Sequence, residues 1–155
     1  MLRKVAASRI QQTGGSFAIV ASRYNALYVD AMLRAAREVL LGAGAKVRIV
    51  RVPGAFEIPV VAAKLAASAS RRYSAILCFG VIFQGETSHA RHIGWGVTQA
   101  LAQIQVQHKV PVIHAVFLFE KEKHAKVRCL GAKHNRGTEA ARTALEMARV
   151  MGSVR

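Results

Sequence analysis

The sequence of 155 residues has few acids, aromatic rings, prolines and cysteines. Its two cysteines, Cys78 and Cys129, lie far apart and form no CxxC motif, so we expect reduced thiols and no structural zinc site. No apolar run reaches the ~18 to 20 residues that span a bilayer, which predicts a soluble, cytoplasmic protein without a membrane segment. Long linkers, internal repeats and low-complexity tracts are also absent from the sequence, which indicates a single domain.

The shortage of acids gives the chain a large positive charge. Eight Asp and Glu stand against 23 Lys and Arg, for a formal net charge of +15. Such a charge favours phosphate-bearing ligands or a polyanionic partner, including nucleic acid. The basic residues are scattered and aromatic residues are few, so the interleaved pattern of base-stacking modules is missing. A solvated basic surface is therefore the favoured interpretation, and a polyanion-binding assembly is the alternative.

The first sixteen residues form a segment of their own in this interpretation. They contain Arg3, Lys4 and Arg9 but no acid, and they end in Gly-Gly-Ser. This slightly resembles a transit peptide, although the segment is short for one. We therefore predict a basic, flexible N-terminal segment over residues 1–16, followed by one domain over residues 17–155.

Apolar patterning alternates between strand and helix along the whole domain. The run at 75–83 is continuous and apolar, as expected for a strand that is covered on both faces. Strands are expected at 17–22, 46–52, 75–83 and 110–119, and helices at 27–43, 60–68, 88–108, 121–130 and 137–152. Strands and helices in this order pair in parallel through right-handed crossovers. The prediction is a three-layer α/β domain with a four-stranded parallel sheet and helices on both faces.

Polar groups follow each predicted strand, at the edge where ligands bind in such sheets. Taken singly they have ordinary explanations: Tyr24 as a rim aromatic, Asn25 as a helix cap, His89 as a structural histidine and Arg128 as a surface charge. Their convergence on one edge favours a binding site. Trp95 and the cysteines carry no functional signal, and burial is the expected reason for each.

Five segments carry a resemblance to a known family. "ASRYNALYVDAML", "VRVPGAFEIPVVAAKLA", "GETSHARHI", "PVIHAVF" and "NRGTEAARTALEMA" resemble 6,7-dimethyl-8-ribityllumazine synthases, enzymes of riboflavin biosynthesis, over about residues 17 to 150. The resemblance implies a flavodoxin-like domain that forms homopentamers with active sites between neighbouring subunits. In some members twelve pentamers form a 60-subunit icosahedral shell, and association with riboflavin synthase is a further expectation.

The same resemblance implies the reaction. 5-Amino-6-ribitylaminouracil condenses with 3,4-dihydroxy-2-butanone 4-phosphate, and phosphate and water are lost without a metal or organic cofactor. His89 matches the proton-transfer histidine, a role that suits a group titrating near neutrality. The phosphate site matches Gly85, the N–H groups of Glu86 and Thr87, and Arg128 from the neighbouring subunit. The expected pyrimidine and ribityl contacts are Tyr24, Asn25, Ala55, Phe56, Glu57, Val81, Ile82, Phe83 and His114, with Arg136 in a supporting role.

One segment departs from the family pattern. His114 stands where many members carry Phe, and "HAVFLFEKEKHAK" differs throughout from the usual sequence. Arg136 replaces a usual Lys, which keeps the charge and changes its geometry. These departures leave a second alternative: a catalytically impaired paralogue that serves as a structural shell.

Overall fold

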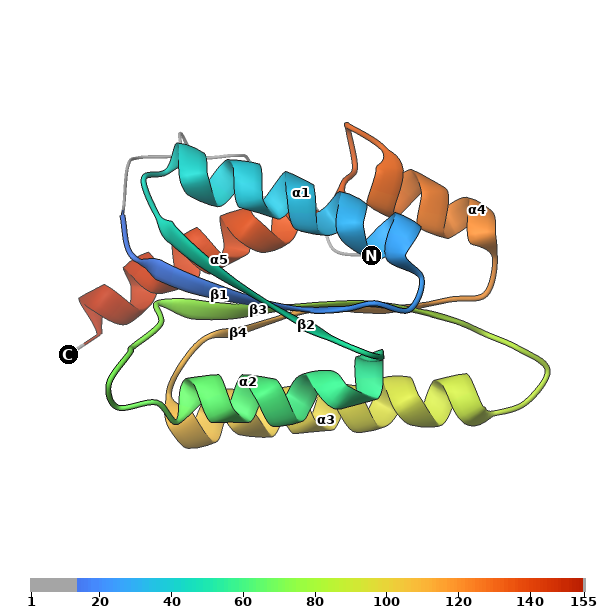
Figure 1. Ribbon diagram of the computed structural model, residues 1–155, viewed down its shortest axis with the longest axis horizontal. Coiled ribbons are helices and arrows are strands. Elements are labelled where there is room, and N and C mark those ends of the chain that lie inside the picture. The colour runs from blue at the N-terminus through green and yellow to red at the C-terminus, as the bar shows by residue number, and fades with distance from the viewer. Residues whose placement is uncertain (1–13, 155) are drawn as a thin grey trace.

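The computed structural model describes residues 14–154, which form three layers (Figure 1). The middle layer is a parallel sheet in the order β2-β1-β3-β4. Its strands are β1 (Ser16–Ser22), β2 (Lys46–Val52), β3 (Ala75–Phe83) and β4 (Val112–Phe119). The helices are α1 (Ala26–Gly42), α2 (Ile58–Ala66), α3 (His89–His108), α4 (Glu122–Ala125) and α5 (Arg136–Ser153), with short turns η1 (Ala55–Glu57) and η2 (Lys126–Leu130). The predicted flavodoxin-like, three-layer fold is confirmed.

The two faces of the sheet hold separate cores because side chains alternate along each strand. Phe17 and Ile19 of β1 face the layer of α1 and α5, where Met32 packs against them. Their neighbours Ala18 and Val20 face the layer of α2 and α3. Figure 1 shows α2 and α3 together below the sheet and α1, α4 and α5 above it. Burial on both faces explains why β1 and β3 are continuously apolar.

The end of β3 extends beyond its neighbour β1. Pairing with β1 ends at Phe79, whereas pairing with β4 continues to Phe83. Residues 80–83 therefore have β4 on one side and no ladder partner from β1 on the other. The loops after β1 and β2 and the start of α3 gather at this carboxyl edge, which creates the space for a site.

Two sequence expectations needed correction. Trp95, expected to be buried, is 66% exposed, because the buried stripe of α3 runs through Ala90, Val97, Leu101 and Ile104 and leaves it on the outer face. The single short helix expected over 121–130 is divided into α4 and the wider turn η2. The cysteines, in contrast, are both free and buried as expected.

The other boundaries agree closely with the pattern. The fourth strand begins at Val112 rather than at 110, after Pro111, whose carbonyl accepts a hydrogen bond from Ile76. Across residues 14–154, no helix combines the length and apolarity needed to cross a bilayer. The predicted N-terminal segment lies almost entirely outside the described residues, and its separation from the domain stays a prediction.

Candidate active site at the carboxyl edge of the sheet

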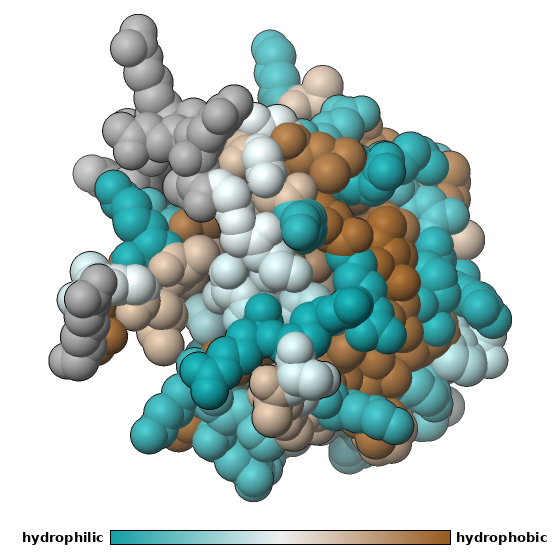
Figure 2. All heavy atoms as spheres, turned by 60° about the vertical axis from the view of Figure 1, so that its left-hand side comes forward, coloured by the Kyte–Doolittle hydropathy of each residue, from teal (hydrophilic) through white to brown (hydrophobic). Residues whose placement is uncertain are grey.

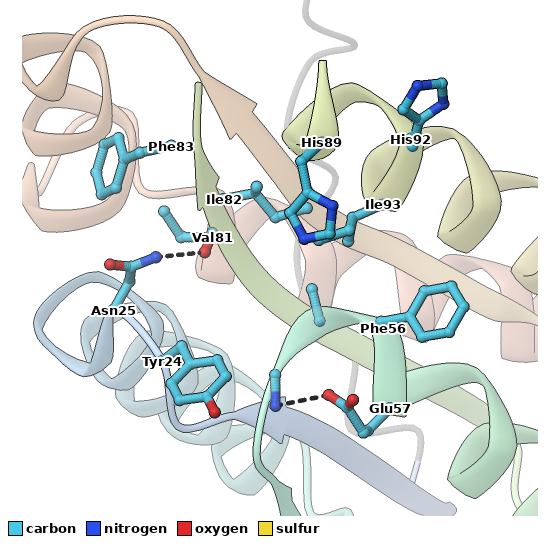
Figure 3. Close-up of a pocket in the computed structure, with 12 residues that line it drawn as sticks. Tyr24, Asn25, Phe56, Glu57, Val81, Ile82, Phe83, His89, His92 and Ile93 are labelled. Carbon is cyan, nitrogen blue, oxygen red and sulfur yellow. Dashed lines mark hydrogen bonds between the residues drawn. The ribbon is translucent and has the colours of Figure 1, made fainter. Parts of the chain in front are cut away.

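Loops from three strands and the start of α3 enclose a cavity of about 690 Å³ (Figure 3). The lining residues are Tyr24, Asn25, Gly54, Ala55, Phe56, Glu57, Val81, Ile82, Phe83, His89, His92 and Ile93. Nine of them were expected from the sequence as site residues. They come from segments as far apart as the first strand and the third helix, so the fold is what brings them together.

Asn25 joins the loop after β1 to the end of β3. Its backbone is left-handed, with φ at 58°, a conformation that Asn tolerates better than most residues. It stands at the N-cap position of α1, yet its side chain makes no capping hydrogen bond there. Instead Nδ2 donates to the Val81 carbonyl oxygen over 2.7 Å. The ordinary explanation of the Asn25 side chain as a helix cap therefore does not hold, because the uncovered end of β3 offers it an acceptor.

The turn at 54–57 presents a carboxylate beside the cavity. One oxygen of Glu57, Oε2, accepts a hydrogen bond from the Gly54 N–H at 2.9 Å. The other carboxylate oxygen has capacity to accept further bonds. A Cβ at Gly54 would lie 2.9 Å from both Glu57 Oε2 and the Tyr24 ring, so a side chain here would displace two of the groups that line the cavity.

Three aromatic residues, Tyr24, Phe56 and Phe83, and two histidines line the cavity. Tyr24 is 68% exposed and Phe56 is 64% exposed, so both have uncovered rings on which a flat ligand could stack. In Figure 3 the His89 ring points toward the space between Ile82 and Phe56, whereas the His92 ring points away from it. The sequence reasoning missed His92 and Ile93. They lie three and four residues after His89, the spacing at which a helix places side chains on one face.

Residues expected at the phosphate site lie next to the cavity rather than in its lining. Gly85, Glu86 and Thr87 are exposed in the loop between β3 and α3. Ser88 occupies the N-cap position of α3 without a side-chain capping bond. The first helical N–H, that of His89, donates instead to Thr87 Oγ1 at 3.4 Å.

Three expected residues lie apart from the cavity lining of this chain. Arg128 is exposed on η2. Arg136, at the start of α5, pairs with Glu139 at 2.5 Å, and its guanidinium lies 6.0 Å from the centre of the Phe117 ring. One subunit therefore does not bring Arg128 or Arg136 to the lining formed around His89.

His114, the third of these residues, lies on β4 against α3. The Val116 N–H donates to its Nδ1 at 3.2 Å, so Nδ1 is the unprotonated nitrogen. Its Nε2 then carries the hydrogen and donates to Thr98 Oγ1 at 2.8 Å, while the Thr98 hydroxyl donates to the Gly94 carbonyl. Burial lowers the pKa of His114 below its ordinary value. The imidazole is therefore neutral with both nitrogens engaged.

Neither thiol has the surroundings of a nucleophile. Burial raises the pKa of Cys78 to about 12 and that of Cys129 to about 11, so both are protonated at neutral pH. Over residues 14–154 no group of three or more His, Cys, Asp or Glu side chains is arranged to hold a metal ion.

Comparison with known proteins identifies the family. The sequence profile of the 6,7-dimethyl-8-ribityllumazine synthases matches residues 14–152. The 6,7-dimethyl-8-ribityllumazine synthase of Stenotrophomonas maltophilia (strain R551-3) is 39% identical over 138 residues, which cover 87% of this chain and 88% of that protein. The protein of the same name from Xanthomonas euvesicatoria pv. vesicatoria (strain 85-10) is 36% identical over 145 residues, 92% of this chain and 93% of that one. The chain belongs to this family.

Membership in the lumazine synthase family confirms the resemblance and the class of enzyme that it implied. The matched region includes every element of the sheet and the whole cavity lining. The chain also covers most of the length of these relatives, so the family comparison applies to the complete domain.

Proposed function

We propose that this lumazine synthase family member condenses 5-amino-6-ribitylaminouracil with 3,4-dihydroxy-2-butanone 4-phosphate to 6,7-dimethyl-8-ribityllumazine, phosphate and water. The observation that carries the proposal is the cavity at the carboxyl edge, where His89 and the 54–57 turn line one space in a chain of this family. Its volume of about 690 Å³ lies within the range of ordinary small-molecule sites.

The end of β3 supports recognition of the pyrimidine ring. Successive strand residues turn their N–H and C=O groups to opposite edges, and Gln84 N–H bonds to β4 through the Phe119 carbonyl. Phe83 and Val81 therefore turn toward the open edge, where the Val81 carbonyl already accepts from Asn25. The N–H and C=O of Phe83 are then the groups that read the donors and acceptors of a pyrimidinedione, with Tyr24 as the stacking ring.

The 54–57 turn supports binding of the ribityl chain. Glu57 has one carboxylate oxygen held by Gly54 and the other available to sugar hydroxyls. Ala55 and Phe56 complete that side of the cavity. A polyol bound here extends from the pyrimidine across the turn toward solvent.

His89 is the proposed proton-transfer group. The amine must attack the ketone, a Schiff base must form, phosphate must leave and the second ring must close, and protons move in each step. An exposed imidazole beside the cavity is placed to accept a proton from a bound ligand and to return it. The phosphate is held by the backbone of Gly85, Glu86 and Thr87 at the start of α3.

Arg128 completes the phosphate site from a neighbouring subunit in this proposal, and His114 and Arg136 act at the same boundary. Support comes from their position outside the cavity lining and from large apolar side chains left uncovered on α2, α3 and the adjoining turn: Phe56, Val60, Trp95 and Val106. Exposed apolar surface of this kind marks protein contacts. A homopentamer is the proposed assembly, with a 60-subunit shell and riboflavin synthase association as further expectations.

The direct test mixes the purified protein with both substrates in a buffer that contains a chelator. We expect a fluorescent product with the spectrum of the lumazine, formed in proportion to protein concentration. Absence of product at saturating concentrations of both substrates would reject the proposal in favour of a structural shell.

A further inference from the structure

Gln84 makes an unusual set of hydrogen bonds between β3 and α3. Its backbone N–H donates to the Phe119 carbonyl at 2.9 Å, which extends the ladder between β3 and β4 by one residue. Its side chain folds back over the following loop, where Nε2 donates to the Gly85 carbonyl at 2.9 Å and to the Thr87 carbonyl at 2.8 Å. Both hydrogens of one amide nitrogen are thus used to hold two peptide groups of a five-residue loop.

The oxygen of the same amide, Gln84 Oε1, indicates that the Gly85 and Thr87 carbonyls determine how the Gln84 side chain is oriented. Gln84 Oε1 is buried and has no hydrogen-bond partner within the part of the chain that the structure describes. An unpaired buried acceptor costs free energy, so the contacts made by Nε2 must outweigh that loss.

Peptide geometry converts these two contacts into the orientation of two donors. A trans peptide is planar, and its N–H points opposite to its C=O. The Gly85 carbonyl shares a peptide with the Glu86 N–H, and the Thr87 carbonyl shares one with the Ser88 N–H. When Gln84 draws both carbonyls toward itself, the N–H groups of Glu86 and Ser88 turn to the opposite side together.

The loop itself is open to solvent. A Cβ added to Gly85 would meet no other atom within 4 Å, and the loop residues from Gly85 to Ser88 are exposed. The two oriented donors lie at the start of α3, a helix of 20 residues whose first N–H, that of His89, donates to Thr87 Oγ1 at 3.4 Å. The N–H groups of Glu86 and Ser88 precede that bond, and the positive end of a helix favours an anion.

We propose that Gln84 is a positioning residue for the phosphate of the four-carbon substrate, acting through the peptide N–H groups of Glu86 and Ser88. This rests on the proposed function for the identity of the anion and extends it, because neither Gln84 nor Ser88 has a role in that function. Gln84 does not touch the substrate. Hydrogen bonding to a peptide carbonyl also strengthens the N–H of the same peptide as a donor.

The test compares Gln84→Met, which keeps length and removes both donors, with Gln103→Met, a matched change of an exposed glutamine on α3. Calorimetry on the assembled, full-length protein measures the affinity of inorganic phosphate and, separately, of the pyrimidine substrate. In Gln84→Met the N–H groups of Glu86 and Ser88 are no longer held toward the phosphate. The loss of two well-directed hydrogen bonds to a charged group should lower phosphate affinity about tenfold or more. Pyrimidine affinity should stay within about twofold, and Gln103→Met should match the unaltered protein on both counts.

A second readout separates orientation from general loosening. Hydrogen exchange of the 84–91 peptide without phosphate should speed up in Gln84→Met while exchange of the strands is unchanged. If Gln84→Met does not fold, Gln84→Glu replaces it at high ionic strength, since the isosteric carboxylate also lacks the two donors and salt screens its charge.

Each outcome decides the proposal. Phosphate affinity equal to that of the unaltered protein, or equal losses for phosphate and pyrimidine, would overturn the role of Gln84. Product formation from the two substrates is measured independently on the unaltered protein. If the unaltered protein forms lumazine but Gln84→Met has no effect on phosphate affinity, the proposed function stands and the role of Gln84 is rejected. If Gln84→Met weakens phosphate binding but the unaltered protein forms no lumazine, the role of Gln84 in anion binding stands and the proposed reaction is rejected.

Discussion

His89 and His114 are imidazoles in contrasting surroundings. His89 is exposed at the start of α3 with its ring toward the cavity, whereas His114 on β4 has both nitrogens hydrogen-bonded. The first is free to exchange protons with a ligand. The second is held in one tautomer by Val116 and Thr98, so a proton added to Nδ1 would face the Val116 N–H.

Replacing His89 tests its role in proton transfer. We expect His89→Ala to lower kcat by about ten- to a few hundred-fold and to leave the affinity for both substrates nearly unchanged, because positioning supplies much of the remaining rate. Steady-state kinetics with each substrate varied in turn measures this. Arg128→Ala serves as the contrasting variant, since it should weaken the phosphate substrate far more than the pyrimidine. A change in KM alone for His89→Ala would contradict the proton-transfer role.

His114 should make stability depend on pH. Its pKa is lowered in the fold from an ordinary value of 6.5, so the unfolded chain takes up this proton at a higher pH than the folded chain does. The stability associated with the neutral imidazole is complete above about pH 6.5 and is lost as the pH falls below it. Urea unfolding at about pH 7.5 and about pH 5.5 should show a smaller acid loss for His114→Phe than for the unaltered protein. Equal losses would mean that His114 does not contribute.

At the scale of elements, α1 and α5 approach each other closely at Gly137. A Cβ at Gly137, in the first turn of α5, would lie 2.0 Å from the Met32 carbonyl oxygen, and the atom in the way is backbone rather than a flexible side chain. We expect Gly137→Ala to force the two helices apart and to cost about 2 kcal/mol or more. Chemical denaturation measures the cost. Gly152→Ala, where an added Cβ meets nothing within 4 Å, is the matched control and should be near neutral.

The segment with α4 and η2 is held to α1 and α5 by polar contacts. The Tyr28 hydroxyl donates to Glu122, and this hydrogen bond is the main reason that the pKa of Tyr28 rises to about 12. Asn135 Nδ2 donates to the Cys129 carbonyl at 2.8 Å, and Asn135 Oδ1 caps α5 by accepting from Gly137. These contacts set the position of η2, and therefore the position from which the exposed Arg128 side chain extends into solvent.

Periodicity predicted the elements well because burial controls them. The continuous apolar runs of β1 and β3 and the helical stripes of α1 and α5 each follow from a face that must be covered. The division of 121–130 into α4 and η2 was not predicted, since it depends on Tyr28 and Asn135 from other elements. Long-range contacts of this kind leave no spacing signal in a local window.

For the candidate site, too, the sequence predicted most of the residues that line the cavity but not the hydrogen bonds between them and the backbone. Residues that end strands or lie in the PGAFEIP motif were expected at the cavity, and Tyr24, Glu57 and His89 do line it. The Asn25 contact with Val81 and the Gln84 contacts with its loop were not foreseen, because each depends on backbone carbonyl directions. Sequence patterns report which residues reach an edge, and they do not report where peptide groups point.

For the whole molecule, the main feature is a surface with many more basic than acidic side chains. The surface in Figure 2 intersperses hydrophilic side chains with apolar patches, as expected for basic residues scattered through the sequence. Ion pairs such as Arg51–Asp30 at 2.7 Å neutralise some charge, but eight acids cannot balance 23 Lys and Arg. A field of this sign attracts anions such as phosphate esters, and it is screened by salt.

The proposed site is shared by two subunits. His89 lines the cavity of one chain and Arg128 of the same chain does not, so the proposed phosphate clamp requires Arg128 from a neighbour. In the proposed homopentamer, a contact between different surfaces of identical subunits would repeat around a closed ring and give every subunit one complete site.

Complementation between two impaired variants tests this claim most directly. His89→Ala and Arg128→Ala are purified separately, dissociated, mixed in equal amounts and reassembled, and lumazine formation is measured at limiting phosphate substrate. Random mixing places an intact His89 opposite an intact Arg128 at about one quarter of the subunit boundaries, so we expect about one quarter of the unaltered activity. A mixed assembly with no more activity than the average of its two parents would contradict a shared site.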